Sequence, residues 1–175
     1  PSFHRDLVCG VATYALEFFR HAPALDTDYV AIGMGSGICG LLAARDGLGL
    51  ATEIVGVVAD GAPAYALSFA AGEVVGTAHA QTLADGVACR VPSAEALALI
   101  RQGAARIVSV SEAAIVQAMR AYYTDTHNLA EGAGALALAA LLQERERQAG
   151  RRVGLVLSGG NVDAEVFAGV LASAC

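Results

Sequence analysis

The fold is decided by the stretch Tyr29-Val30-Ala31-Ile32-Gly33-Met34-Gly35-Ser36-Gly37-Ile38-Cys39-Gly40-Leu41-Leu42. Its apolar start predicts a buried strand, its glycines predict a turn, and the apolar run that follows predicts a helix. Glycine lets the backbone adopt positive φ and come close to a ligand, and the free N–H groups at a helix start attract anions. Residues 33–37 are therefore a candidate phosphate-binding loop. The alternative is that the glycines serve only a tight strand-to-helix connection.

The rest of the chain alternates between helical and strand patterns. Helices are predicted at 6–20, 38–46, 63–71, 93–102, 112–123 and 135–148, with one more near the end of the chain. Strands are predicted at 29–32, 52–58, 106–110 and 153–157, with a short one at 73–75. The strand at 52–58 is continuously apolar, as in parallel sheets covered on both faces. We predict an α/β fold: an open, mostly parallel, twisted sheet flanked by helices.

Composition narrows the class of protein. The 175 residues are 55% hydrophobic, which is enough to bury a core, and we expect a single domain over 1–175. No apolar run approaches the ~18 residues of a membrane span, so we expect no membrane association. The formal net charge of −6, without a basic cluster, argues against nucleic acid as a partner. No cleavable signal is recognised at the N-terminus, which makes a cytoplasmic location the expectation.

Three notable features stand at the ends of predicted strands or at the starts of predicted helices. Residues 33–37 follow one strand, Ser158 follows another, and Glu131 stands at the start of a helix. Loops after neighbouring strands of a doubly wound sheet converge on one cleft, so these residues are expected to line one small-molecule site. The alternatives are a helix N-cap role for Ser158 and a first-turn acid at Glu131 that interacts with the helix dipole.

Four motifs resemble the later part of the threonine/serine dehydratases. They are Gly-Met-Gly-Ser-Gly at 33–37, Thr-Leu-Ala-Asp-Gly-Val at 82–87, Asn-Leu-Ala-Glu-Gly-Ala-Gly-Ala at 128–135 and Val-Leu-Ser-Gly-Gly-Asn at 156–161. These dehydratases are pyridoxal-phosphate enzymes of fold type II, a group that includes serine racemase. The motifs follow the family order over essentially the whole chain, and residues 1–4 and 10–17 resemble the stretch that re-enters the large domain. The resemblance implies that 1–175 is the C-terminal part of the cofactor-binding domain.

The resemblance also implies how a cofactor would be held. Five consecutive residues would bind the phosphate of pyridoxal 5'-phosphate through main-chain N–H groups: Gly33, Met34, Gly35, Ser36 and Gly37. Ser158 would hydrogen-bond the pyridine nitrogen, and Glu131 would lie near the ring and the reacting centre. Asp85 and Gly86 would lie on the substrate side of the cofactor. A neutral hydroxyl cannot keep the pyridine nitrogen protonated as a carboxylate would, which favours β-elimination over transamination.

Two features depart from the family pattern. All eleven lysine and arginine residues are arginine, so the chain lacks the lysine that binds the cofactor as a Schiff base, and it also lacks the loop that binds the substrate carboxylate. Family members with a divalent-cation site carry a glutamate where this chain has Val58, and further ligands where it has Ala62 and Ala64. Asp60 is two positions away from replacing that glutamate, so we expect no metal site.

The activity that the resemblance implies is β-elimination from a small hydroxy amino acid. As part of a longer enzyme, expected to be a homodimer, the chain would convert L-threonine or L-serine to a 2-keto acid and ammonia. One alternative is an NAD(P)-binding domain of an oxidoreductase, because residues 35–40 match the dinucleotide fingerprint and Glu53 or Asp60 could contact a ribose. Another is a non-catalytic remnant that binds a partner or a phosphate without turnover.

Overall fold

The computed structural model describes residues 3–22 and 24–172, so residues 1 and 2 of the resemblance lie outside the described residues. Within this part of the chain, four parallel strands form one sheet in the order β3-β2-β1-β4. They are β1 (Thr27–Ala31), β2 (Glu53–Ala59), β3 (Arg106–Val110) and β4 (Val153–Leu155). The predicted open parallel sheet is confirmed.

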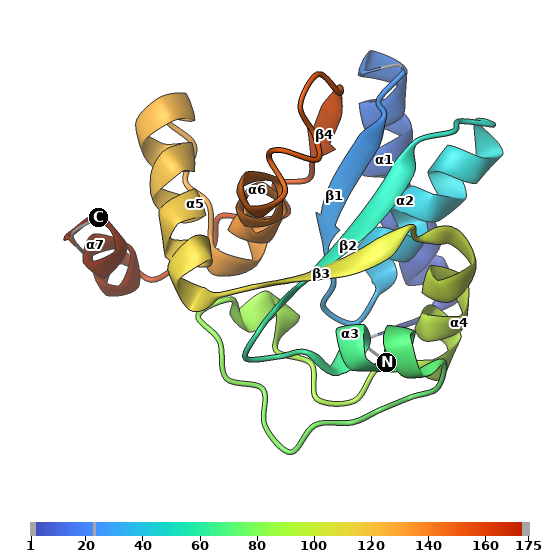
Figure 1. Ribbon diagram of the computed structural model, residues 1–175, viewed down its shortest axis with the longest axis horizontal. Helices are drawn as coiled ribbons and strands as arrows, with labels where there is room; N and C mark the ends of the chain where they lie inside the picture. Colours follow the sequence, from blue (N-terminus) through green and yellow to red (C-terminus); the bar gives the residue numbers. More distant parts are fainter. Residues whose placement is uncertain (1–2, 23, 173–175) are drawn as a thin grey trace.

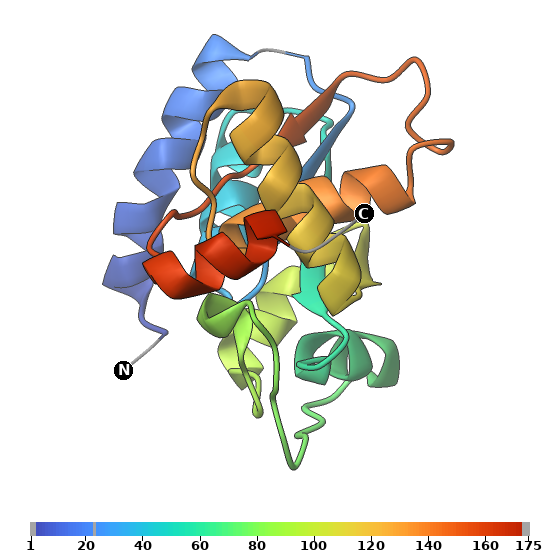
Figure 2. The ribbon, with the colours of Figure 1, turned by 90° about the vertical axis from the view of Figure 1, so that its left-hand side faces the viewer.

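Helices cover both faces of the sheet (Figure 1). One face carries α1 (Arg5–His21), α2 (Ser36–Gly47) and α4 (Ala94–Gly103), and the other carries α5 (Glu112–Thr126) and α6 (Gly132–Gln143). The short helix α3 (Ala64–Ala71) and the 3-10 turn η1 (Asp85–Val87) belong to the segments between β2 and α4. In Figure 2, α7 (Ala164–Ala172) crosses α5, where the rings of Tyr123 and Phe167 lie 5.4 Å apart. None of the described helices is both long and apolar enough to cross a bilayer.

Strand side chains alternate between two hydrophobic cores. Tyr29 packs in the core that includes α5 and α6, whereas Val30 and Ile32 pack in the core that includes α1, α2 and α4. This period of two explains why a strand buried on both faces has a continuous apolar sequence. Full burial of each large apolar side chain stabilises the fold by about 1.5–3 kcal/mol.

Strand β1 lies at the topological switch point of the sheet. The chain passes from β1 to β2 and β3 on one side, and β4 then pairs with the other side of β1. In open α/β sheets, ligands bind outside the carboxyl ends of the strands at such a point. The loops that follow β1 and β4 therefore flank the expected binding crevice.

Three elements differ from the sequence predictions. The strand predicted at 73–75 is wrong, because the Ser68 hydroxyl bonds both the N–H (2.8 Å) and the carbonyl (3.2 Å) of Val75. The helix predicted to reach 148 ends at Gln143, and consecutive turns lead from there to Gly150, whose φ is 77°. The strand predicted to reach 157 ends at Leu155, which pairs with Tyr29, and the Val156 N–H makes a last hydrogen bond to the Tyr29 carbonyl (3.1 Å).

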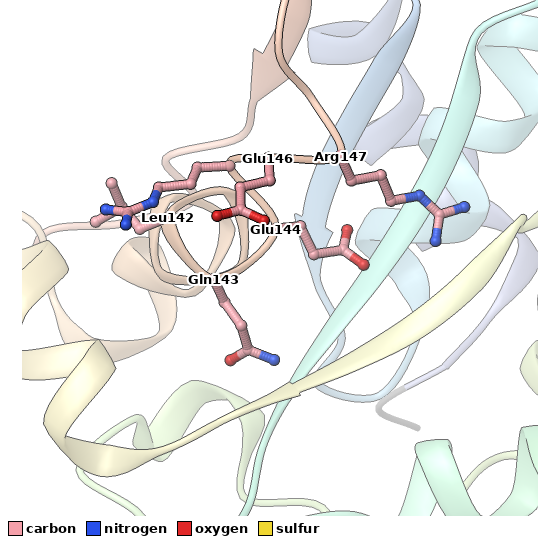
Figure 3. Close-up of a pocket in the computed structure, with 6 residues that line it drawn as sticks. Leu142, Gln143, Glu144, Glu146 and Arg147 are labelled. Atoms are coloured by element: carbon pink, nitrogen blue, oxygen red, sulfur yellow. The ribbon is translucent and has the colours of Figure 1, made fainter.

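A polar network at the amino end of the sheet fixes the far end of α6. The Arg106 guanidinium pairs with the Glu144 carboxylate, which also accepts from the Tyr29 hydroxyl (2.5 Å). Gln148 Nε2 donates to the same hydroxyl (2.8 Å). Figure 3 shows Glu144 turned toward the strands, in a pocket lined by residues 142–147. Burial raises the pKa of Glu144, but the hydrogen bonds from Arg106 and Tyr29 outweigh it and hold that pKa below its ordinary value.

Asp28 is a buried acidic residue near the start of β1. Its side chain is fully buried (0% exposed), and neither carboxyl oxygen has a hydrogen-bond partner among the described residues. A Cβ on Gly154 of the neighbouring β4 would lie only 3.0 Å from Asp28 Oδ1, so the side chain is tightly enclosed. Burial raises the pKa of Asp28 to about 7, because the charged form loses its hydration.

We expect Asp28→Asn to remove a pH dependence of stability. The folded carboxyl keeps its proton up to a pH of about 7, whereas the unfolded one loses it near ~3.9. The folded state therefore binds more protons in this window, and stability falls as the pH rises through it. Between these pH values the wild-type free energy of unfolding should decrease by on the order of 2–4 kcal/mol relative to the Asn variant. Urea unfolding of both proteins across this range measures the difference, and parallel pH profiles would contradict the expectation.

Candidate functional site

The glycine loop 33–37 connects β1 to α2. Gly35 is the N-cap of α2 and has a φ of 100°, a left-handed conformation that favours glycine. Within the described residues, no group accepts a hydrogen bond from the main-chain N–H groups of 33–37. These N–H groups lie at the positive end of the α2 dipole and are free to bind an anion.

Two tyrosines bind carbonyl oxygens of this loop. The Tyr65 hydroxyl donates to the Met34 carbonyl (2.8 Å), and the Tyr14 hydroxyl donates to the Gly37 carbonyl (3.4 Å). Burial raises the pKa of both phenols, so both remain protonated donors. The sequence analysis missed these residues, because a tyrosine within an apolar helical pattern looks the same as a core aromatic. A phenol hydroxyl in an otherwise apolar segment could have indicated them, because a buried hydroxyl needs a hydrogen-bond partner.

Glycines bring four loop segments into direct contact. A Cβ on Gly33 would collide with the carbonyl oxygen of Gly86, and a Cβ on Gly134 would collide with that of Gly159. A Cβ on Gly86 would lie 3.0 Å from the Cβ of Ala133. The loop after β1, the turn η1, the start of α6 and the loop after β4 therefore touch one another. The four motifs of the sequence are assembled at one end of the sheet.

A cavity of about 520 Å³ lies between α1 and the carboxyl ends of β1 and β4. Ser36, Gly37 and Ser158 line it together with Tyr14. Its volume falls in the range of about 300–1,000 Å³ that is typical of small-molecule sites. Ser158 is exposed, its hydroxyl has no partner in the described part of the chain, and the following helix begins only at Ala164. The N-cap interpretation of Ser158 is therefore wrong.

A second pocket, of about 290 Å³, contains Asp85 and Glu131. Glu131 is the N-cap of α6, but its side chain makes no capping hydrogen bond. The Glu131 N–H donates to the Gly159 carbonyl (3.1 Å), and its carboxylate packs against the Cα of Gly159. The residues expected to line one crevice therefore do not share one pocket: Ser36, Gly37 and Ser158 line the first, and Asp85 and Glu131 line the second. Gly33, Met34, Gly35 and Gly86 line neither of these pockets.

The positions considered for a cation do not gather ligands. Val58 is buried within β2, and Asp60 is exposed after the end of that strand. Ala62 and Ala64 are both buried. Across residues 3–22 and 24–172, no group of three or more His, Cys, Asp or Glu side chains is placed to hold a metal ion.

Comparison with known proteins decides the family. A family model described as pyridoxal-phosphate dependent enzyme matches residues 1–159. The chain belongs to this family. The resemblance carried by the four motifs is confirmed, and the cofactor of the family is pyridoxal 5'-phosphate. The NAD(P) alternative is not supported: Glu53 begins β2 at the end of the sheet opposite the loops, where it pairs with Arg151 (3.3 Å).

The relatives include ammonia-lyases and serine racemases. The L-threonine ammonia-lyase of Geobacter sulfurreducens is 34% identical over 165 residues, which cover 94% of this chain and 41% of the relative. The L-threo-3-hydroxyaspartate ammonia-lyase of a Pseudomonas species is 31% identical over 172 residues, covering 98% and 54%. A solved threonine deaminase from T.th. has a TM-score of 0.84 at 31% identity and covers 89% of this chain and 58% of that one. The chain spans about half the length of these relatives.

We expect Gly33→Ala to destabilise the loop assembly and Gly37→Ala to be tolerated. The new Cβ at Gly33 must displace the Gly86 backbone, whereas a Cβ at Gly37 meets nothing within 4 Å. Gly33→Ala should lower the free energy of unfolding by about 1–3 kcal/mol, and Gly37→Ala should change it by less than about 1 kcal/mol, in the stabilising direction. Chemical denaturation of the two variants measures this. Equal stabilities would show that the Gly33–Gly86 contact is not a constraint.

Proposed function

We propose that the chain is the cofactor-binding half of an ammonia-lyase that uses pyridoxal 5'-phosphate. The complete enzyme would eliminate water from a hydroxy amino acid such as L-threonine or L-serine and release a 2-keto acid and ammonia. The observation that carries the proposal is the loop 33–37, whose unpaired N–H groups lie at the switch point of the sheet in a member of this family. The names of the relatives support the reaction class.

The residues of the chain fit the cofactor. The free N–H groups of Gly33, Met34, Gly35, Ser36 and Gly37 form an anion cradle at the start of α2. The Ser158 hydroxyl lines the same cavity as Ser36 and has no protein partner in the described part of the chain, so it is available to a ring nitrogen. We assign the phosphate to residues 33–37 and the pyridine nitrogen to Ser158.

The chemistry is divided between cofactor and protein. When bound, pyridoxal phosphate supplies an electron sink for the negative charge that develops at the substrate α-carbon. Ser158 offers that ring a neutral hydroxyl, which limits its positive charge. Glu131 holds a carboxylate free of any capping bond, in a pocket shared with Asp85 and adjacent to Gly86, where it can accept or return a proton. Ser36 and Gly37 form the part of the anion cradle that opens into the larger cavity.

Several elements of the complete enzyme lie outside this chain. The Schiff-base lysine must come from another segment, because the chain contains no lysine. We propose a homodimeric enzyme that works in the cytoplasm on a small amino acid. The acidic balance, with a formal net charge of −6, is compatible with these assignments and gives no support to a nucleic-acid partner.

We expect covalent cofactor attachment and turnover to require the lysine-bearing segment. After incubation with pyridoxal phosphate and borohydride, mass spectrometry should find no cofactor on a side chain of the 175-residue chain. The full product of the gene should carry one cofactor per chain and release ammonia from L-threonine or L-serine. L-Alanine, which has no β-leaving group, is the matched control substrate. A full product that binds the cofactor without any ammonia release would favour the non-catalytic remnant.

We expect Ser158→Ala to alter the cofactor without altering the fold. In the full gene product, this variant should unfold at the wild-type temperature, while its cofactor absorbance spectrum and turnover change. Ser111→Ala is the matched control, because the Ser111 side chain caps α5 by accepting from the Ala114 N–H (3.2 Å). Its loss should cost about 1 kcal/mol and leave the spectrum unchanged. An unchanged spectrum and unchanged kinetics for Ser158→Ala would remove Ser158 from the site.

A further inference from the structure

Tyr65 is a buried residue of α3 whose hydroxyl contacts the glycine loop 33–37. Its side chain is 1% exposed. The hydroxyl donates to the Met34 carbonyl (2.8 Å) and accepts from the Ser93 N–H (3.2 Å), which fixes the orientation of the phenol O–H. A Cβ on Gly35 would lie 3.1 Å from the same oxygen. Tyr65 therefore joins the loop after β1 to the N-cap of α4.

The hydrogen bond to Met34 determines which way the next N–H group points. The peptide bonds of the described residues are all trans, and in a planar trans peptide the carbonyl and the N–H point in opposite directions. Because the Met34 carbonyl is directed at Tyr65, the Gly35 N–H is directed away from it. The Met34 side chain is held as well, since the Cys89 thiol lies 3.6 Å from the Met34 sulfur.

If the Met34–Gly35 peptide were rotated by about 180°, anion binding would be weakened. Gly35 has a φ of 100° and no side chain, so its flanking peptides are less restricted than those of other residues. A rotated Met34–Gly35 peptide would present a carbonyl oxygen in place of an N–H group. An oxygen of that kind repels a phosphate, whereas the N–H attracts it.

We infer that Tyr65 is a positioning residue for phosphate recognition, holding the Met34–Gly35 peptide with its N–H group toward the anion. This inference rests on the proposed binding of pyridoxal phosphate by residues 33–37. Tyr65 lines neither of the two pockets that hold Ser158 and Glu131, so it acts through the loop and not by touching the cofactor.

The test compares Tyr65→Phe with Tyr29→Phe in the full gene product. Both tyrosines are buried, and both hydroxyls have several partners, but the partners of Tyr29 are Glu144, Gln148 and Arg106 at the amino end of the sheet. Dissociation constants of the apo-protein are measured for pyridoxal 5'-phosphate and for pyridoxal, which lacks the phosphate. The ³¹P resonance of the bound cofactor is recorded for each variant, and it can be read from whatever fraction of the protein is folded.

Tyr65→Phe should weaken binding of pyridoxal phosphate by about 3- to 10-fold, as expected for one lost hydrogen bond. Its affinity for pyridoxal should stay at the wild-type value, and its ³¹P resonance should shift. Tyr29→Phe should change neither affinity nor resonance, although it removes comparable hydrogen bonds. An equal loss of affinity for both ligands, or an unmoved ³¹P resonance, overturns the role of Tyr65. If the wild type does not prefer pyridoxal phosphate over pyridoxal, the phosphate loop itself is wrong and the proposed function fails with it.

Discussion

The site depends on direct backbone contact between glycines. Gly33 touches the Gly86 carbonyl, and Gly134 touches that of Gly159, at distances that leave no room for a Cβ. These contacts join loops that are far apart in the chain. Because a packed interior tolerates little change in volume, a methyl group at Gly33 would require the Gly86 backbone to shift.

Two residues of the loop, Met34 and Ser36, are not glycine. Recognition through main-chain N–H groups makes no demand on a side chain that points away from the anion. The Met34 side chain packs against the core that contains Cys89, and Ser36 begins α2. Met34 and Ser36 are therefore compatible with the anion cradle that we propose at 33–37.

Polar side chains form a hydrogen-bonded network at the amino end of the sheet, and main-chain N–H groups without a protein partner in the described part of the chain lie at its carboxyl end. At the amino end, Arg106, Glu144, Tyr29 and Gln148 bond to one another and hold α6 in place. At the carboxyl end, the N–H groups of 33–37 and the Ser158 hydroxyl have no partner in the described part of the chain. These groups are therefore available to the ligand that we propose at this end of the sheet. The hydrogen-bonded network holds the C-terminal end of α6 against the strands.

Local patterns in the chain were enough to establish the fold class and the order of the main helices and strands, because apolar periodicity is a local property of the sequence. The four ordered motifs were enough to indicate the family. They also identified residues 33–37, Asp85, Gly86, Glu131 and Ser158 as candidates. Packing in three dimensions was needed to show that Val75 bonds to the Ser68 hydroxyl and joins no strand, and that Ser158 caps no helix. It was also needed to show that the candidate residues do not share one pocket. Only the folded chain reveals the hydrogen bond from Tyr65 to Met34. The two residues are distant in the sequence, and the Tyr65 hydroxyl meets the Met34 carbonyl only when α3 packs against the loop.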